Sequence, residues 1–348
     1  PVQPPSASPA ASPAASPAAG QSGAQTATAG PRQPLPPPPP SVRGEVLVSA
    51  NHDEHSLTVV ELVTARVVGS IPVDGPVQSV ALTSDGAKVV GTIAGENVRT
   101  VFIADLTTLR MTSEIGVGAQ SYGIVAIPGT QQFAVSNRGA NSVSIIDPDS
   151  GMTRAVIPVG NQPSGIVAST LDGTMRIFVA NAGDGSVSAI DVDTLRVVNT
   201  TQVGGRPTEL AATSDGHRLF VLRPRDASVV VVDTQAAQPL GEFRVGFNPT
   251  GLVVSPTGRH LYVSASDQNR NLWKVDLATM ATVQSYSLSG SAGGSAVSFG
   301  NDPNRLYLAT MDGRVTYFDT THERQLQSAD IGRGPTDLAI GAFRGARQ

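Results

Sequence analysis

Short β-branched segments that end in an acidic residue recur along the chain at a nearly constant interval, and this repeat restricts the possible folds most strongly. The segments span 56–61, 100–105, 142–147, 186–191, 228–233, 271–276 and 314–319. Their terminal acids are 44, 42, 44, 42, 43 and 43 residues apart. A fixed period of this length is typical of an array of identical supersecondary units.

A second marker has the same spacing. In one repeat it is a turn that contains Pro163, followed two residues later by Gly165. The positions equivalent to Pro163, which we call the Pro slot, are Val77, Ser121, Pro207, Pro249, Ala292 and Pro335. They step by the same intervals as the acids, so the two markers together indicate seven repeats.

Each repeat contains four predicted strands. In the fourth repeat they span 164–168, 175–180, 186–191 and 196–203, and Asp- and Gly-rich turns separate them. Such runs read as antiparallel hairpins, and no long segment has the 3.6-residue period of a helix. A repeated four-stranded unit of about 43 residues is a propeller blade. We therefore predict an all-β, seven-bladed β-propeller of four-stranded antiparallel blades.

The two ends of the repeat region predict how the ring closes. The first repeat begins with 46–50, which matches the second strand of a blade, so its innermost strand is missing. The last Pro slot, Pro335, begins an additional strand at 336–340. Placing this C-terminal strand in the first blade closes the ring and removes two open sheet edges.

Residues 1–43 differ from the propeller region, 44–348. They hold 13 of the 26 prolines and only two charges, Arg32 and Arg43. Such a segment buries too little apolar surface to fold, and its proline run favours a stiff polyproline II spacer. The chain starts with Pro1 and has no apolar stretch of about 18 residues. We expect a secreted protein, periplasmic or extracellular, whose signal peptide has been removed.

Composition excludes several function classes. Cysteine is absent, which excludes disulfides, thiolate metal sites and a Cys-linked haem. The net charge of −4 and the 4% aromatic content disfavour nucleic acid as a partner, although six arginines are expected near the channel. These are Arg99, Arg138, Arg223, Arg225, Arg270 and Arg314. Aliphatic residues must supply the core.

The repeats resemble a known family. The segment Phe178-Val179-Ala180-Asn181, the segment 186–191 and Tyr262-Val263-Ser264 look like the YVTN-type β-propeller repeat. The resemblance covers about residues 45–343 and implies a secreted, periplasmic or surface-layer protein. The family hosts many roles, so the resemblance does not identify an activity.

Polar residues gather where the channel of such a ring would open. Two residues after the Pro slot, most repeats have Gly, but the fifth has Glu209 and the first blade has Asp337. Arg206 and Arg333 precede them. We interpret these residues as a binding site for a polar ligand or a partner, and a solvated channel mouth is the alternative. The complete set of candidates is Gln120, Asn161, Gln162, Arg206, Glu209, Asn248, Arg333 and Asp337.

Two other groups of residues are weaker candidates. His52, Asp53 and His55 share one loop and could bind a metal, but no other repeat supplies a matching His, so a solvated loop is the simpler interpretation. The acids that end the 56–61-type segments are expected to hold Asx turns. No cofactor is predicted.

Three functions fit these observations. The first is a non-enzymatic scaffold that binds a protein or surface partner in a cell-envelope assembly, because no catalytic constellation is found. The second is an enzyme that resembles propeller lactonases or lyases and uses Glu209 or Asp337 as acid or base. The third is an accessory protein that binds a small polar ligand or a cofactor.

Overall fold

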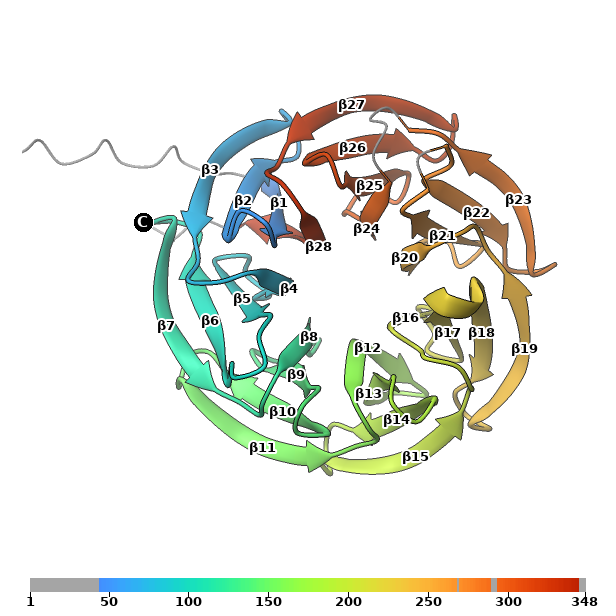
Figure 1. Cartoon of the computed structure of the whole chain (residues 1–348), viewed down its shortest axis with the longest axis horizontal. Helices are drawn as coiled ribbons and strands as arrows, with labels where there is room; N and C mark the ends of the chain where they lie inside the picture. Colours follow the sequence, from blue (N-terminus) through green and yellow to red (C-terminus); the bar gives the residue numbers. More distant parts are fainter. Residues whose placement is uncertain (1–43, 268, 289–292, 344–348) are drawn as a thin grey trace, which may run out of the picture. The chain divides into compact units, whose positions relative to one another are not determined.

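A computed structural model of the protein describes residues 44–267, 269–288 and 293–343. These residues form seven four-stranded antiparallel sheets arranged around a central axis, as Figure 1 shows. The predicted all-β, seven-bladed propeller is therefore confirmed. The described residues contain one helical element, the 3₁₀ turn η1 (Pro224–Asp226). No helix in this part of the chain is long and apolar enough to span a membrane. The predicted tail, 1–43, and the Pro-slot residue Ala292 lie outside the described residues.

Each blade contains four strands ordered from the axis to the rim. The innermost strands are β4 (Val77–Leu82), β8 (Ser121–Ala126), β12 (Pro163–Leu171), β16 (Glu209–Ala212), β20 (Pro249–Val254), β24 (Gly294–Phe299) and β28 (Pro335–Phe343). The second strands are β1 (Gly44–Asn51), β5 (Lys88–Ile93), β9 (Phe133–Asn137), β13 (Thr174–Asn181), β17 (Arg218–Arg223), β21 (His260–Ala265) and β25 (Arg305–Thr310). The third strands are β2 (Ser56–Glu61), β6 (Thr100–Asp105), β10 (Ser142–Asp147), β14 (Ser186–Asp191), β18 (Ser228–Asp233), β22 (Leu272–Asp276) and β26 (Arg314–Asp319). The outermost strands are β3 (Arg66–Pro72), β7 (Arg110–Gly116), β11 (Met152–Pro158), β15 (Arg196–Gln202), β19 (Gln238–Arg244), β23 (Ala281–Tyr286) and β27 (Arg324–Asp330).

The C-terminal strand closes the ring. The first blade has the strand order β28-β1-β2-β3, and β28 pairs antiparallel with β1 from Gly44 opposite Phe343 to Asn51 opposite Pro335. In Figure 1 the red strand β28 lies beside the blue strand β1. The predicted closure is confirmed, so the first blade is built from both ends of the propeller region.

The hydrophobic core is divided among the interfaces between blades. Seven clusters of buried side chains are found, and each joins two neighbouring blades. The third strands are buried along nearly their whole length, because both faces of a blade pack against neighbours. Most of the core side chains are aliphatic, as the composition predicts, with fully buried aromatics such as Phe102 and Phe220 among them.

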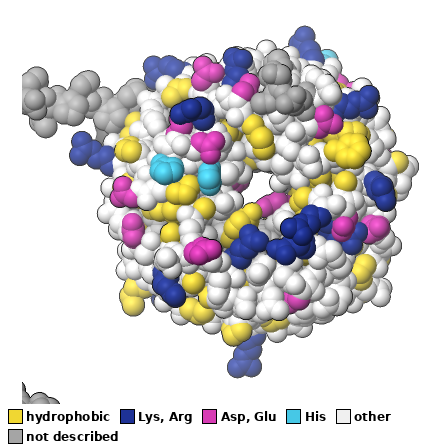
Figure 2. Space-filling model, in the orientation of Figure 1, with side chains coloured by type: hydrophobic (Ala, Val, Ile, Leu, Met, Phe, Trp, Pro, Cys, Tyr) yellow, Lys and Arg dark blue, Asp and Glu magenta, His cyan; other side chains and the backbone are white. Residues whose placement is uncertain are grey.

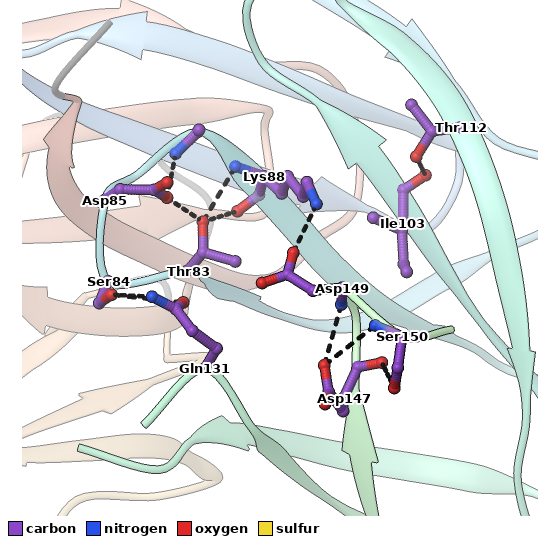
Figure 3. Close-up of polar contacts among 11 residues, drawn as sticks. Thr83, Ser84, Asp85, Lys88, Ile103, Thr112, Gln131, Asp147, Asp149 and Ser150 are labelled. Atoms are coloured by element: carbon purple, nitrogen blue, oxygen red, sulfur yellow. Dashed lines mark hydrogen bonds and ion pairs between the residues drawn. The ribbon is translucent and has the colours of Figure 1, made fainter. Parts of the chain in front are cut away.

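Six of the seven acids that end the third strands hold the adjoining turns through backbone nitrogens, as predicted, whereas Glu61 accepts a hydrogen bond from Thr64 Oγ1 (2.6 Å). Asp147 Oδ1 accepts hydrogen bonds from the backbone nitrogens of Asp149 (3.0 Å) and Ser150 (3.2 Å), as Figure 3 shows. The equivalent turns are held in the same way by Asp105, Asp191, Asp233, Asp276 and Asp319. These carboxylates are therefore structural.

The asparagine at the end of the YVTN-like segment also has a structural role. Asn181 Nδ2 donates to Ser186 Oγ (3.0 Å) and Ser188 Oγ (2.9 Å), so it connects the second strand of its blade to the third. Asn51 and Asn137 make the same kind of bond in the first and third blades. The YVTN-like segment thus contributes a hydrogen-bonded connection between two strands of the blade.

Candidate functional site

The seven innermost strands enclose an axial channel. Its cavity has a volume of about 520 Å³ and is lined by residues of all seven strands. We call the face that carries the loops into these strands, and the loops between second and third strands, the mouth face. The two kinds of loop contact each other, since His52 N donates to Gly334 O (2.9 Å) and Arg138 N donates to Gln120 O (2.8 Å). Figure 2 shows the channel opening at the centre of the ring, with an acidic side chain inside it.

Close packing of strands explains the preference for glycine two residues after the Pro slot. A Cβ atom on Gly165 would lie 2.3 Å from Thr208 O, and one on Gly123 would lie 2.7 Å from Ser164 O. Neither glycine has a positive φ. The side chain is therefore excluded by the next blade's backbone rather than by the local turn.

Asp337 occupies this position in the first blade and is held firmly. Its Oδ2 accepts hydrogen bonds from Ser79 Oγ (2.6 Å) and Val80 N (3.1 Å), and its Oδ1 accepts one from Leu338 N (2.8 Å). Burial raises the pKa of Asp337, and these donors oppose the rise because they stabilise the ionised form. The carboxylate joins the first blade to the second.

Glu209, the first residue of β16, occupies the same position in the fifth blade and has no such support. Its carboxyl group makes no hydrogen bond or ion pair with any residue in the described part of the chain. Burial raises the pKa of Glu209 to about 8, and the charge of Asp337 adds to the rise. The pKa of Tyr122 is raised first by burial and then by Glu209, with a smaller contribution from Asp337. The three residues are half-buried and line the same cavity, so their charges interact within the channel.

Three of the predicted rim residues have a conformational role. Gln120, Gln162 and Asn248 have positive φ angles of 53°, 51° and 48°, and each immediately precedes its Pro slot. Their carbonyl oxygens accept backbone N–H groups from the adjacent mouth-face loop of the same blade. Asn is enriched at left-handed positions, so the turn by itself accounts for Asn248.

The predicted arginines lie on the mouth-face loops and not beside the carboxyl groups. Arg206 Nη2 donates to Gln162 Oε1 at 3.1 Å, and Arg333 Nε pairs with Glu54 Oε1 at 3.3 Å. Asn161 also lies on this rim, where its backbone nitrogen donates to Asp184. Among the described residues no ion pair joins either arginine to Glu209 or Asp337. The two carboxyl groups thus line the same channel, whereas the guanidinium groups of Arg206 and Arg333 bind residues of the mouth-face loops.

Tyr122 was not among the residues predicted for the channel mouth, whereas Arg138 was one of the six arginines expected near the channel. Tyr122 lines the channel, and the Arg138 guanidinium lies 5.3 Å from the centroid of its ring. A signal was present in the sequence, because Tyr122 directly follows a Pro slot and is the only aromatic residue at that position in the seven repeats.

The loop proposed as a weak metal candidate lies between β1 and β2 on the mouth face. His52 Nδ1 lies 3.0 Å from Asp53 Oδ1, and His55 has a φ of 50° at the end of the same turn. Within the described ranges, no three His, Asp or Glu side chains are grouped so that they could hold a metal ion. The loop therefore offers a His–Asp hydrogen bond and a turn.

Comparison with known proteins supports the fold. The chain is similar to the structure of Kuenenia stuttgartiensis hydrazine synthase, with a TM-score of 0.66 and 17% identity over 75% of this chain and 88% of that one. It is also similar to a functionally unknown protein from Desulfotomaculum acetoxidans DSM 771, with a TM-score of 0.69 and 16% identity over 85% of this chain and 99% of that one. No family model and no curated protein sequence matches the chain. These similarities extend to the seven-bladed fold, and the resemblance to the YVTN repeat stays a prediction.

Proposed function

We propose that this chain is a non-enzymatic scaffold of the cell envelope that binds a protein partner through the mouth face. The observation that carries the proposal is the exposure of large apolar side chains there. Phe247, in the loop before β20, is 78% exposed, and Met311, in the loop between β25 and β26, is 50% exposed. The two residues lie on loops of neighbouring blades, and apolar side chains exposed together on one face favour an interaction site there.

Arginines accompany these two residues. Arg225 and Arg270 are exposed on the loops between β17 and β18 and between β21 and β22, next to the blades of Phe247 and Met311. Neither forms an ion pair with a described residue. Phe, Met and Arg are enriched in protein interfaces. A partner that presents an apolar segment flanked by acidic residues would fit this surface.

A pull-down from the envelope fraction of the source organism tests the proposal. We expect the unmodified chain to recover a stoichiometric partner and Phe247→Ala to recover at least tenfold less. The matched control is Val63→Ala, because Val63 is also 78% exposed but lies in the turn between β2 and β3 on the opposite face. Equal recovery by the two variants, or no partner at all, would contradict the proposal.

A second candidate function is acid–base catalysis in the channel. It is favoured by Glu209, whose pKa is raised to about 8 and therefore lies near neutral pH, where a general acid works well. Assays with lactones and with substrates for β-elimination would detect it. Turnover that is abolished in Glu209→Gln would establish catalysis, and the scaffold proposal would then be incomplete.

A further inference from the structure

We propose that Glu209, Asp337 and Tyr122 form a binding site in the axial channel for a small ligand with one protonated amine group. This site is independent of the proposed docking surface, since it uses other residues and lies inside the ring. Three observations carry it: the cavity, the polar groups in it that lack a partner, and the charge that the two carboxyl groups hold.

The channel contains polar groups that the protein does not satisfy. Its Ser and Thr hydroxyls are committed to protein partners: Ser79 donates to Asp337, Thr250 to Gly294 O and Thr336 to Val77 O. The side chains of Glu209, Tyr122 and Gln78 also line the cavity, and none of these side chains makes a hydrogen bond to a described residue. All three residues are half-buried, so their unpaired side chains are accessible from the channel to a ligand that supplies hydrogen-bond donors.

The charge of the carboxyl pair fits a single positive charge. Three hydrogen-bond donors stabilise ionised Asp337, whereas Glu209 has none, so Asp337 ionises first and Glu209 second. Between the two steps the pair holds one proton and one negative charge. An ammonium group can replace this one proton, because it carries a single positive charge and offers three N–H donors to the carboxyl oxygens.

Arg138 limits the charge of the ligand. Its guanidinium lies over the Tyr122 ring and offsets part of the rise in the pKa of that phenol, so its positive charge acts at this end of the site. A second ammonium group on the ligand would be repelled there. We therefore expect a monoamine to bind more tightly than a diamine of the same length.

Calorimetric titration of the full chain with n-butylammonium chloride tests the site. Glu209→Gln should weaken binding at least tenfold, because the amide of the variant cannot lose a proton and become negatively charged. The matched control is Glu96→Gln, which removes an exposed carboxylate from the loop between β5 and β6. Butan-1-ol should not bind, and butane-1,4-diammonium should bind more weakly than n-butylammonium. Equal binding by the alcohol, or unchanged binding in Glu209→Gln, would overturn the proposal.

A second measurement uses the unmodified protein, in case the variant does not fold. The charged and titratable groups that face Glu209 are Asp337 and Tyr122, with Arg138 beyond the ring. Binding of the cation should cause Glu209 to release its proton. Titrations in two buffers of different ionisation enthalpy should therefore show proton release near pH 7, and the affinity should rise between pH 6 and pH 9, where the amine stays protonated. Absence of binding, or binding without proton release, would overturn the proposal.

Discussion

Two carboxyl groups at the same position of the repeat behave differently because of their neighbours. Asp337 receives donors from Ser79, Val80 and Leu338, so the protein stabilises its charge. Glu209 is desolvated without any donor and lies in the field of Asp337, so the protein disfavours its charge. Position in the repeat therefore determines where a side chain lies, and the contacts of the neighbouring blade determine what it can do.

The raised pKa of Glu209 predicts a loss of stability with rising pH. The unfolded chain releases this proton near the ordinary pKa of 4.5 and the folded chain near 8, so the folded state holds the extra proton between these values. The free energy of unfolding should therefore fall as the pH rises from about 5 to about 8. Glu209→Gln, which cannot ionise, should lack this contribution. Urea unfolding of both proteins at several pH values measures it, and parallel pH profiles would exclude it.

At the scale of the element, the innermost strands are limited by how closely they approach one another. Gly165 N donates to Thr208 O at 2.7 Å across two blades, and a Cβ atom at Gly165 would lie 2.3 Å from the same oxygen. Gly165 thus makes a hydrogen bond to the next blade, and the same close contact leaves no room for a side chain at this position. The repeated glycine reflects the convergence of strands at the axis.

Gly165→Ala should therefore separate β12 from β16 and lower the free energy of unfolding by about 1–3 kcal/mol, the usual cost of overpacking. Gly241→Ala in β19 is a suitable control, because a Cβ atom there would meet nothing within 4 Å and its φ is not positive. Chemical denaturation of both variants tests this. A destabilisation of the same size in both would show that crowding at the axis is not the cause.

At the scale of the whole molecule, the ring depends on the contact between its ends. Leu338, Ala339 and Phe343 of β28 are buried, and Leu338 and Phe343 belong to two different interblade clusters. The C-terminal strand therefore supports both interfaces of the first blade. A propeller without it would expose two apolar surfaces and one unpaired edge of β1.

Deletion of 335–348 should cost far more stability than deletion of 1–43. Burial of Leu338 and Phe343 alone contributes about 3–6 kcal/mol, and the hydrogen bonds between β28 and β1 are lost as well. We expect the C-terminal deletion to lower the melting temperature strongly or to prevent folding, and the N-terminal deletion to leave it nearly unchanged. Equal melting temperatures in thermal scans would refute the role of closure.

The sequence by itself determined the repeat, the number of blades, the strands and the closing strand. These properties depend on local patterns, such as the β-branched runs that end in Asp147 or Asp191, and every copy of the repeat reports the same pattern. The bounds of six third strands match their prediction, and the remaining one begins at Leu272 rather than Asn271. The Asx turns were predictable for the same reason.

Only the tertiary structure decided which of the predicted site residues line the channel and which lie on the mouth-face loops. Arg206 and Arg333 are near Glu209 and Asp337 in sequence, yet they point to partners on the mouth-face loops, while Tyr122 from another blade joins the carboxyl groups. The ionisation of Glu209 depends on burial and on a charge from a distant part of the chain. Such couplings act through space between blades, and a repeat pattern specifies each blade but not the groups that meet at the axis.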